Sequence, residues 1–138
     1  MDDKRLHKLG VGEAELSAAC WALAGLRSSN ELKREFARLA DEHREAAEAL
    51  GARGARMHEV LAAARALVQA ALEPGGTIGW LREREHALIR DYLALDTVAA
   101  VDDETRKRLR RELLPAAYDR YTRVDRLLAV NETDRVPA

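Results

Sequence analysis

Residues 31–50 carry the stretch that decides the fold, ELKREFARLADEHREAAEAL. Its apolar positions recur at alternating steps of four and three residues, which is the spacing of one face of an α-helix. The positions on this face are Leu32, Phe36, Leu39, His43, Ala46 and Leu50. The stretch therefore predicts a helix over about 31–51 with one buried face, and the glycines at 51 and 54 predict its end.

The segments on either side repeat this pattern and predict four further helices. We expect long helices over about 5–27, 77–100 and 103–130, and a shorter one over about 55–73. Ser28 and Glu31 have the spacing of a capping box, which predicts the start of the second helix. Acidic residues at 102–104 favour the start of the last helix, and Pro115 is expected to bend it.

Four long amphipathic helices bury their apolar faces by packing against one another. The sequence therefore predicts an all-α fold, an antiparallel four-helix bundle that forms a single domain over residues 1–138. The segment 55–73 lies between the second and third bundle helices, so we expect it to be a crossover helix. No strand-like alternation competes with this interpretation.

The composition favours a soluble, cytoplasmic protein without nucleic-acid or membrane partners. A net charge of −1 creates no field that would attract nucleic acid or anionic lipid. The single cysteine, Cys20, cannot form an internal disulfide, which suits a reducing compartment. No apolar run approaches the roughly 20 residues of a membrane span. The basic run 106–111 is flanked by acidic residues, which favours surface salt bridges over nucleic-acid contact.

Two polar residues occupy positions on these otherwise apolar faces. One is His43, and the other is Glu85 in the fourth predicted segment, on the line Ile78, Leu81, Glu85, Leu88, Tyr92 and Leu95. A lone carboxylate in a leucine-rich core is costly, so Glu85 is expected to have a partner there. The apolar line of the last helix runs through Leu114, Ala117 or Tyr118, Tyr121, Val124 and Leu128.

Several stretches of the chain follow the pattern of one known superfamily. They are LKREFARLADE at 32–42, AAEAL at 46–50, the break PGG at 74–76, Glu85 with Tyr92 seven residues later, and YTRVDRL at 121–127. In these stretches, over about residues 6–128, the chain resembles the ferritin-like superfamily, the fold of rubrerythrin. It is most similar to a bacterial branch of unknown function with a helical insertion between the second and third bundle helices. The resemblance loosely implies a stress-related accessory role.

Di-iron members of that superfamily use a Glu from two helices and a Glu-x-x-His pair from each of the other two. The resemblance places these positions on Ser17 or nearby Glu13, on His43 and Ala46, on Glu85, and on Tyr118 and Tyr121. Only Glu85 is the expected ligand type, so a complete di-iron site is not expected. The one literal Glu-x-x-His pair, Glu83 and His86, lies off the core line.

Two interpretations of this centre stay open. In the first, Glu13, His43, Glu85, Tyr118 and Tyr121 belong to a buried polar network, in which imidazole and phenol groups satisfy the Glu85 carboxylate. In the second, the same residues form a reduced site for iron or another divalent metal. We favour the network, and expect no catalytic residue and no cofactor.

The leading hypothesis is therefore a non-enzymatic helical bundle that acts through protein–protein contacts or in a stress-related accessory role. The alternative is a metal-binding protein or metal-dependent oxidoreductase that uses a reduced site around His43 and Glu85. Trp21 and Trp80 lie beside the core lines, where large aromatic residues often form subunit contacts. We therefore expect a homo-oligomer, a dimer in the simplest case, while the sequence identifies no other protein partner.

Overall fold

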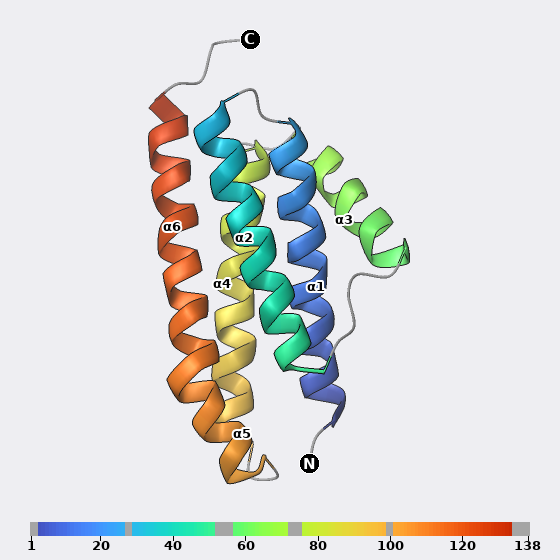
Figure 1. The fold of residues 1–138 in the computed structure, drawn as a ribbon, viewed down its shortest axis with the longest axis vertical. Coiled ribbons are helices and arrows are strands. Elements are labelled where there is room, and N and C mark those ends of the chain that lie inside the picture. The colour runs from blue at the N-terminus through green and yellow to red at the C-terminus, as the bar shows by residue number, and fades with distance from the viewer. Residues whose placement is uncertain (1–2, 27–28, 52–56, 72–75, 99–100, 134–138) are drawn as a thin grey trace.

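The computed structural model describes residues 3–26, 29–51, 57–71, 76–98 and 101–133, which form helices and short turns (Figure 1). The helices are α1 (Asp3–Leu26), α2 (Asn30–Ala49), α3 (Met57–Ala70), α4 (Gly76–Asp96), α5 (Asp103–Arg108), the π-helical turn η1 (Leu109–Leu113) and α6 (Leu114–Thr133). No strand occurs in these ranges, so the all-α prediction is confirmed. None of the described helices is both long enough and apolar enough to cross a membrane.

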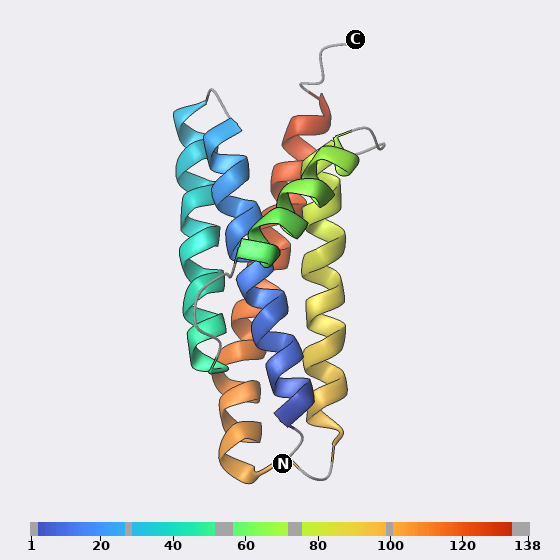
Figure 2. The same ribbon diagram turned by 90° about the vertical axis from the view of Figure 1, so that its right-hand side faces the viewer.

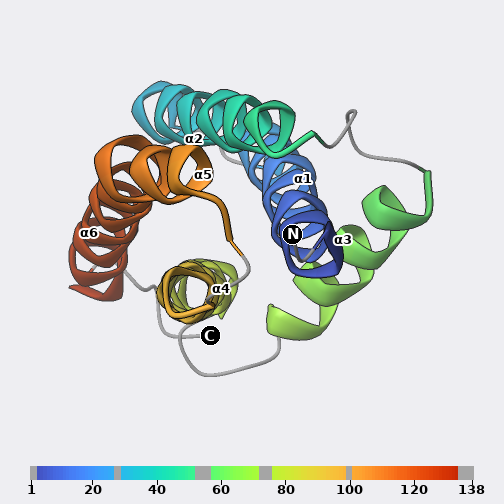
Figure 3. The ribbon, with the colours of Figure 1, turned by 90° about the horizontal axis from the view of Figure 1, so that it is seen from below.

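Four long helices, α1, α2, α4 and α6, lie around a common core, as the view along them shows (Figure 3). The shorter helix α3 lies outside this group and packs against α1 and α4. It crosses both helices obliquely (Figure 2). This helix lies within the segment 55–73, for which the sequence predicts a crossover between the second and third long helices.

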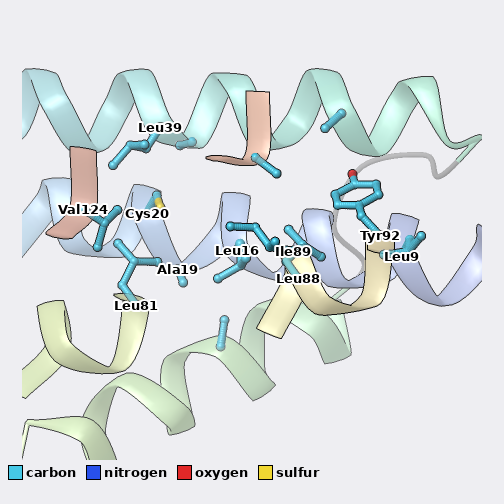
Figure 4. Close-up of a cluster of buried hydrophobic side chains, with 14 of the residues drawn as sticks. Leu9, Leu16, Ala19, Cys20, Leu39, Leu81, Leu88, Ile89, Tyr92 and Val124 are labelled. Atoms are coloured by element: carbon cyan, nitrogen blue, oxygen red, sulfur yellow. The ribbon is translucent and has the colours of Figure 1, made fainter. Parts of the chain in front are cut away.

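The core is built from the apolar faces that the periodicity predicts. Leu16 and Cys20 of α1, Leu39 of α2 and Leu81 of α4 are almost completely buried and face one another (Figure 4). Burying one such leucine side chain contributes about 1.5–3 kcal/mol relative to leaving it exposed. Packing of these faces therefore supplies most of the stability that holds the four long helices together.

The observed ends of α2 agree in part with those predicted from the sequence. The helix begins at Asn30, and the hydroxyl of Ser29 accepts a hydrogen bond from the backbone N–H of Leu32. The N-cap is thus Ser29 rather than Ser28, which lies outside the described residues. Gly51 adopts a φ of +84°, a conformation that glycine tolerates best, and α2 ends there as predicted.

The last long helix contains a widened turn just before Pro115. In η1 the backbone N–H of Leu114 donates to the carbonyl of Leu109, five residues earlier. A proline has no N–H to donate, and its ring crowds the preceding turn, so the helical pattern is disturbed at this point. The buried positions of this helix are 109, 113, 117, 120 and 124. Ala117 and Val124 are buried as predicted, whereas Arg120 takes the step between them that the sequence assigns to Tyr121, and Tyr118 is exposed.

Candidate functional site

Five polar side chains meet in the middle of the core, and we call this cluster the polar centre. Glu13 comes from α1, His43 from α2, Glu85 and Tyr92 from α4, and Arg120 from α6. Four of them are fully buried, and Arg120 is 2% exposed. Buried charged side chains are tolerated only where they are paired. The polar centre is therefore defined by how its members neutralise one another.

Glu13 is the hub of this cluster. Its Oε2 lies 2.7 Å from Nδ1 of His43. Its Oε1 accepts hydrogen bonds from the Tyr92 hydroxyl and from Nη2 of Arg120, each at 2.9 Å. Hydrogen bonds to an ionised carboxylate are among the stronger ones in proteins, above all where the donor is also charged. One side chain on α1 thereby links α2, α4 and α6.

His43 lies between the two carboxylates. Its Nδ1 faces Glu13, and its Nε2 is hydrogen-bonded to Oε1 of Glu85. Burial alone would lower the pKa of His43, but the carboxylates of Glu85 and Glu13 outweigh it and raise the pKa to about 9. The imidazole is therefore protonated at neutral pH, so both ring nitrogens donate.

The charges of the polar centre are balanced. The carboxylates of Glu13 and Glu85 face the imidazolium of His43 and the guanidinium of Arg120. Nε of Arg120 is 3.9 Å from Oε2 of Glu85, and neither atom makes a hydrogen bond. Burial, followed by the nearby Glu13 carboxylate, raises the pKa of Tyr92, so this phenol stays a neutral donor.

The donor set does not fit a metal ion in this arrangement. The two nitrogens of His43 point to different carboxylates, so the imidazole has no lone pair to direct at an ion held by Glu13 and Glu85. The cationic Arg120 fills the remaining side of Glu13. Within the described ranges, no group of three or more His, Cys, Asp and Glu side chains is arranged to hold a metal.

Three of the predicted site residues come together, and two do not. Glu13, His43 and Glu85 meet as expected of either interpretation. Tyr118 is 47% exposed. Tyr121 is partly buried and has its ring 5.6 Å from the guanidinium carbon of Arg82. The expectation that these two tyrosines satisfy Glu85 is thus corrected.

Sequence reasoning missed two members of the polar centre, Tyr92 and Arg120. Tyr92 lies on the predicted core line of α4, but the pattern does not reveal that its hydroxyl reaches Glu13. Arg120 lies three residues after Ala117 and four before Val124, which is the spacing of one helix face. That signal was available, but an arginine on such a line is more often exposed than buried.

Cys20 lies in the core and behaves as a small apolar residue. Burial, together with the Glu85 carboxylate, raises its pKa well above the usual value for a thiol. We expect the native protein to react with an aromatic disulfide reagent at least about a hundredfold more slowly than the denatured chain, because the thiolate is the reactive form. Absorbance of the released thiolate measures both rates, and equal rates would contradict the buried position.

Three residues of the basic run at 106–111 form ion pairs, which agrees with the predicted salt bridges. Arg106 and Arg110 both form ion pairs with Asp96. Arg108 pairs with Glu112 one turn later. This end of the described chain therefore carries interleaved charges of both signs.

The polar centre is closed to the solvent. A surface hollow beside it is lined by residues of α1 and α4, such as Gly12, Glu15 and Arg84, but by no member of the centre. A second hollow lies at α5 and η1, away from the centre.

Comparison of the chain with protein-family models, with curated proteins and with solved structures finds no match. The inference about function therefore rests on this geometry and on the outer surface.

Proposed function

We propose that this protein is a non-enzymatic helical bundle that acts through protein–protein contacts of its outer surface, first of all with a second copy of itself. The closed, charge-balanced polar centre is the observation that carries the proposal. A catalytic group must lie within hydrogen-bond reach of its substrate. The carboxylates and the imidazole of the centre have no exposed surface, so their role is to hold α1, α2, α4 and α6 together.

We further propose that the fold is an antiparallel, ferritin-like bundle. The course of the chain supports this, because α1 and α6 run toward one end of the molecule and α2 and α4 toward the other (Figure 1). A single crossover connection between the second and third bundle helices is typical of ferritin-like folds, and α3 lies in that connection. The polar centre draws at least one residue from each bundle helix, which also fits the resemblance.

Self-association is proposed to involve Trp21 on α1. This side chain is 51% exposed, although tryptophan is among the residues most often buried at the centre of protein interfaces. One turn further on, the space beside Gly25 is open, so a partner could approach the helix closely there. The expected assembly is a dimer of identical chains.

Light scattering over a wide range of protein concentration tests this contact. We expect a dimer, and Trp21→Ser should weaken it at least about tenfold, because truncating a central interface tryptophan commonly costs 2 kcal/mol or more. Leu93→Ser is the matched control, because Leu93 is 42% exposed but belongs to α4. A protein that stays monomeric at the highest concentration would overturn the proposal.

A metal-dependent protein, including an oxidoreductase, is the competing proposal. It is favoured by the meeting of Glu13, His43 and Glu85, and by Oε2 of Glu85, which makes no hydrogen bond. It also requires His43 to lose its proton and one of its carboxylate partners. Metal analysis of protein purified without chelator separates the two. Stoichiometric iron, zinc or manganese that disappears in His43→Ala and Glu85→Ala would establish the metal-dependent function.

A further inference from the structure

The two buried carboxylates of the polar centre come from neighbouring helices, Glu13 from α1 and Glu85 from α4. Two negative charges in a core of low dielectric constant need two positive charges close by. In many helical proteins a pair of carboxylates in such a place would bind a metal cation. Here His43 supplies one positive charge and Arg120 the other.

We propose that Arg120 occupies the cation position between Glu13 and Glu85, and that its presence excludes a divalent metal ion from the polar centre. The guanidinium contacts both carboxylates. Its Nη2 is 2.9 Å from Oε1 of Glu13, and its Nε is 3.9 Å from Oε2 of Glu85. These are the two carboxylate oxygens that His43 leaves free, because the imidazole binds the other oxygen of each residue.

The charge of the centre gives the physical reason for exclusion. Two carboxylates, one imidazolium and one guanidinium sum to zero, so a divalent ion would add two uncompensated positive charges. Burying even one uncompensated ion carries a large desolvation penalty. Metal can therefore enter only if a resident cation leaves, and Arg120 is the one whose guanidinium contacts both of the oxygens that His43 leaves free.

Removal of Arg120 has a definite consequence. It leaves the centre with one unmatched negative charge and uncovers the Glu85 oxygen and one side of the Glu13 oxygen, which keeps its hydrogen bond from Tyr92. A divalent ion that enters there exceeds this negative charge by one, and a hydroxide bound in place of one water ligand balances the difference. Carboxylate oxygens are suitable ligands for Mn²⁺, with water completing the coordination. The structure therefore assigns to Arg120 the difference between a metal-free core and a core that binds metal.

Binding of Mn²⁺ to purified variants tests the proposal. The electron paramagnetic resonance signal of the free ion, which disappears on binding, and metal analysis after dialysis both measure how much Mn²⁺ is bound. Arg120→Ala is expected to bind about one equivalent. The wild-type protein and Arg120→Lys, which keeps the positive charge, are expected to bind none in the centre. Arg120→Ala combined with Glu85→Gln should lose the ion again, because one oxygen ligand and its charge are gone.

Each result decides for or against the proposal. Wild-type protein that binds Mn²⁺, with loss of binding in Glu85→Gln, would overturn it, and so would a folded Arg120→Ala that binds none. If Arg120→Ala does not fold alone, recovery of its helical circular dichroism on addition of Mn²⁺ supports the proposal. Arg120→Gln, which removes the charge but fills more of the space than alanine does, then serves as the second variant, and failure of both to respond to Mn²⁺ overturns the proposal. Self-association through Trp21 is measured separately, so the two proposals can fail independently.

Discussion

Glu13→Gln is expected to lower the free energy of unfolding by about 3–5 kcal/mol, the range found when one partner of a buried charge pair is removed. The substitution keeps the shape of the side chain, but it removes the charge and replaces one of the two acceptor oxygens by an NH2 donor that would face another donor. His43 and Arg120 would then share the single carboxylate of Glu85, leaving a net positive charge in the core. A typical domain is stable by only about 5–15 kcal/mol, so a loss of this size threatens folding itself.

Urea denaturation followed by far-ultraviolet circular dichroism measures this loss. The matched control is Glu15→Gln, two residues along the same helix. Glu15 is partly exposed and forms a 3.3 Å ion pair with Arg84 at the surface. Such pairs contribute about 0–1 kcal/mol, so the control should unfold almost as the wild type does. Equal effects of the two substitutions would show that the polar centre does not stabilise the fold.

The stability of the protein is expected to fall as the pH rises from about 6.5 to 9. The pKa of His43 is raised to about 9 in the folded protein, whereas an unfolded histidine titrates near 6.5. A group whose pKa is raised by folding contributes its full stabilisation below the unfolded value and loses it through the folded value. The difference of about 2.5 units corresponds to about 3 kcal/mol.

The same urea titrations, repeated across this pH range, test the assignment to His43. His43 contacts Glu13 from α1 and Glu85 from α4. Tyr92 from α4 and Arg120 from α6 reach the same carboxylates. The pKa values of Tyr92 and of Cys20 are raised by burial, so neither group loses its proton in the folded protein within the window. The Cys20 thiol of the unfolded chain ionises at about 8.5, so the assignment to His43 is made from the part of the curve below about pH 8. His43→Gln should be less stable than the wild type at pH 6, and its stability should be nearly independent of pH up to about 8. A wild-type protein with no such dependence would contradict a protonated His43.

Much of the fold could be predicted from the sequence, because the periodicity and the end signals of a helix lie within a short stretch of the chain. The stretch 31–50 and Gly51 predict α2 to within about two residues of its observed ends, as is usual for such boundaries. The helical content of the whole described chain follows from the same periodicity. Pro115 predicts a disturbance of the last helix, but the sequence does not reveal that the disturbance takes the form of a π-helical turn at Leu109–Leu113.

The candidate site was predictable only in part. His43 and Glu85 stand out as polar residues on apolar lines, and Glu13 follows from the ferritin-like resemblance. Arg120 does not stand out, because arginine side chains occur mostly at the surface and its value here depends on carboxylates that are distant in sequence. The hydrogen bond of the Tyr92 hydroxyl is equally hard to predict, since its partner Glu13 lies 79 residues away in the sequence.

The contacts of Glu13 also set an order in which the helices can pack while the chain is being synthesised. Its contact with His43 spans 30 residues, whereas its contact with Arg120 spans 107 residues. During synthesis from the N-terminus, α1 and α2 can pair early, but the neutralising guanidinium emerges only with α6. Until then a partly assembled core would enclose an unmatched negative charge. Completion of the dry interior must therefore wait for the last helix, which makes the final docking step a cooperative one.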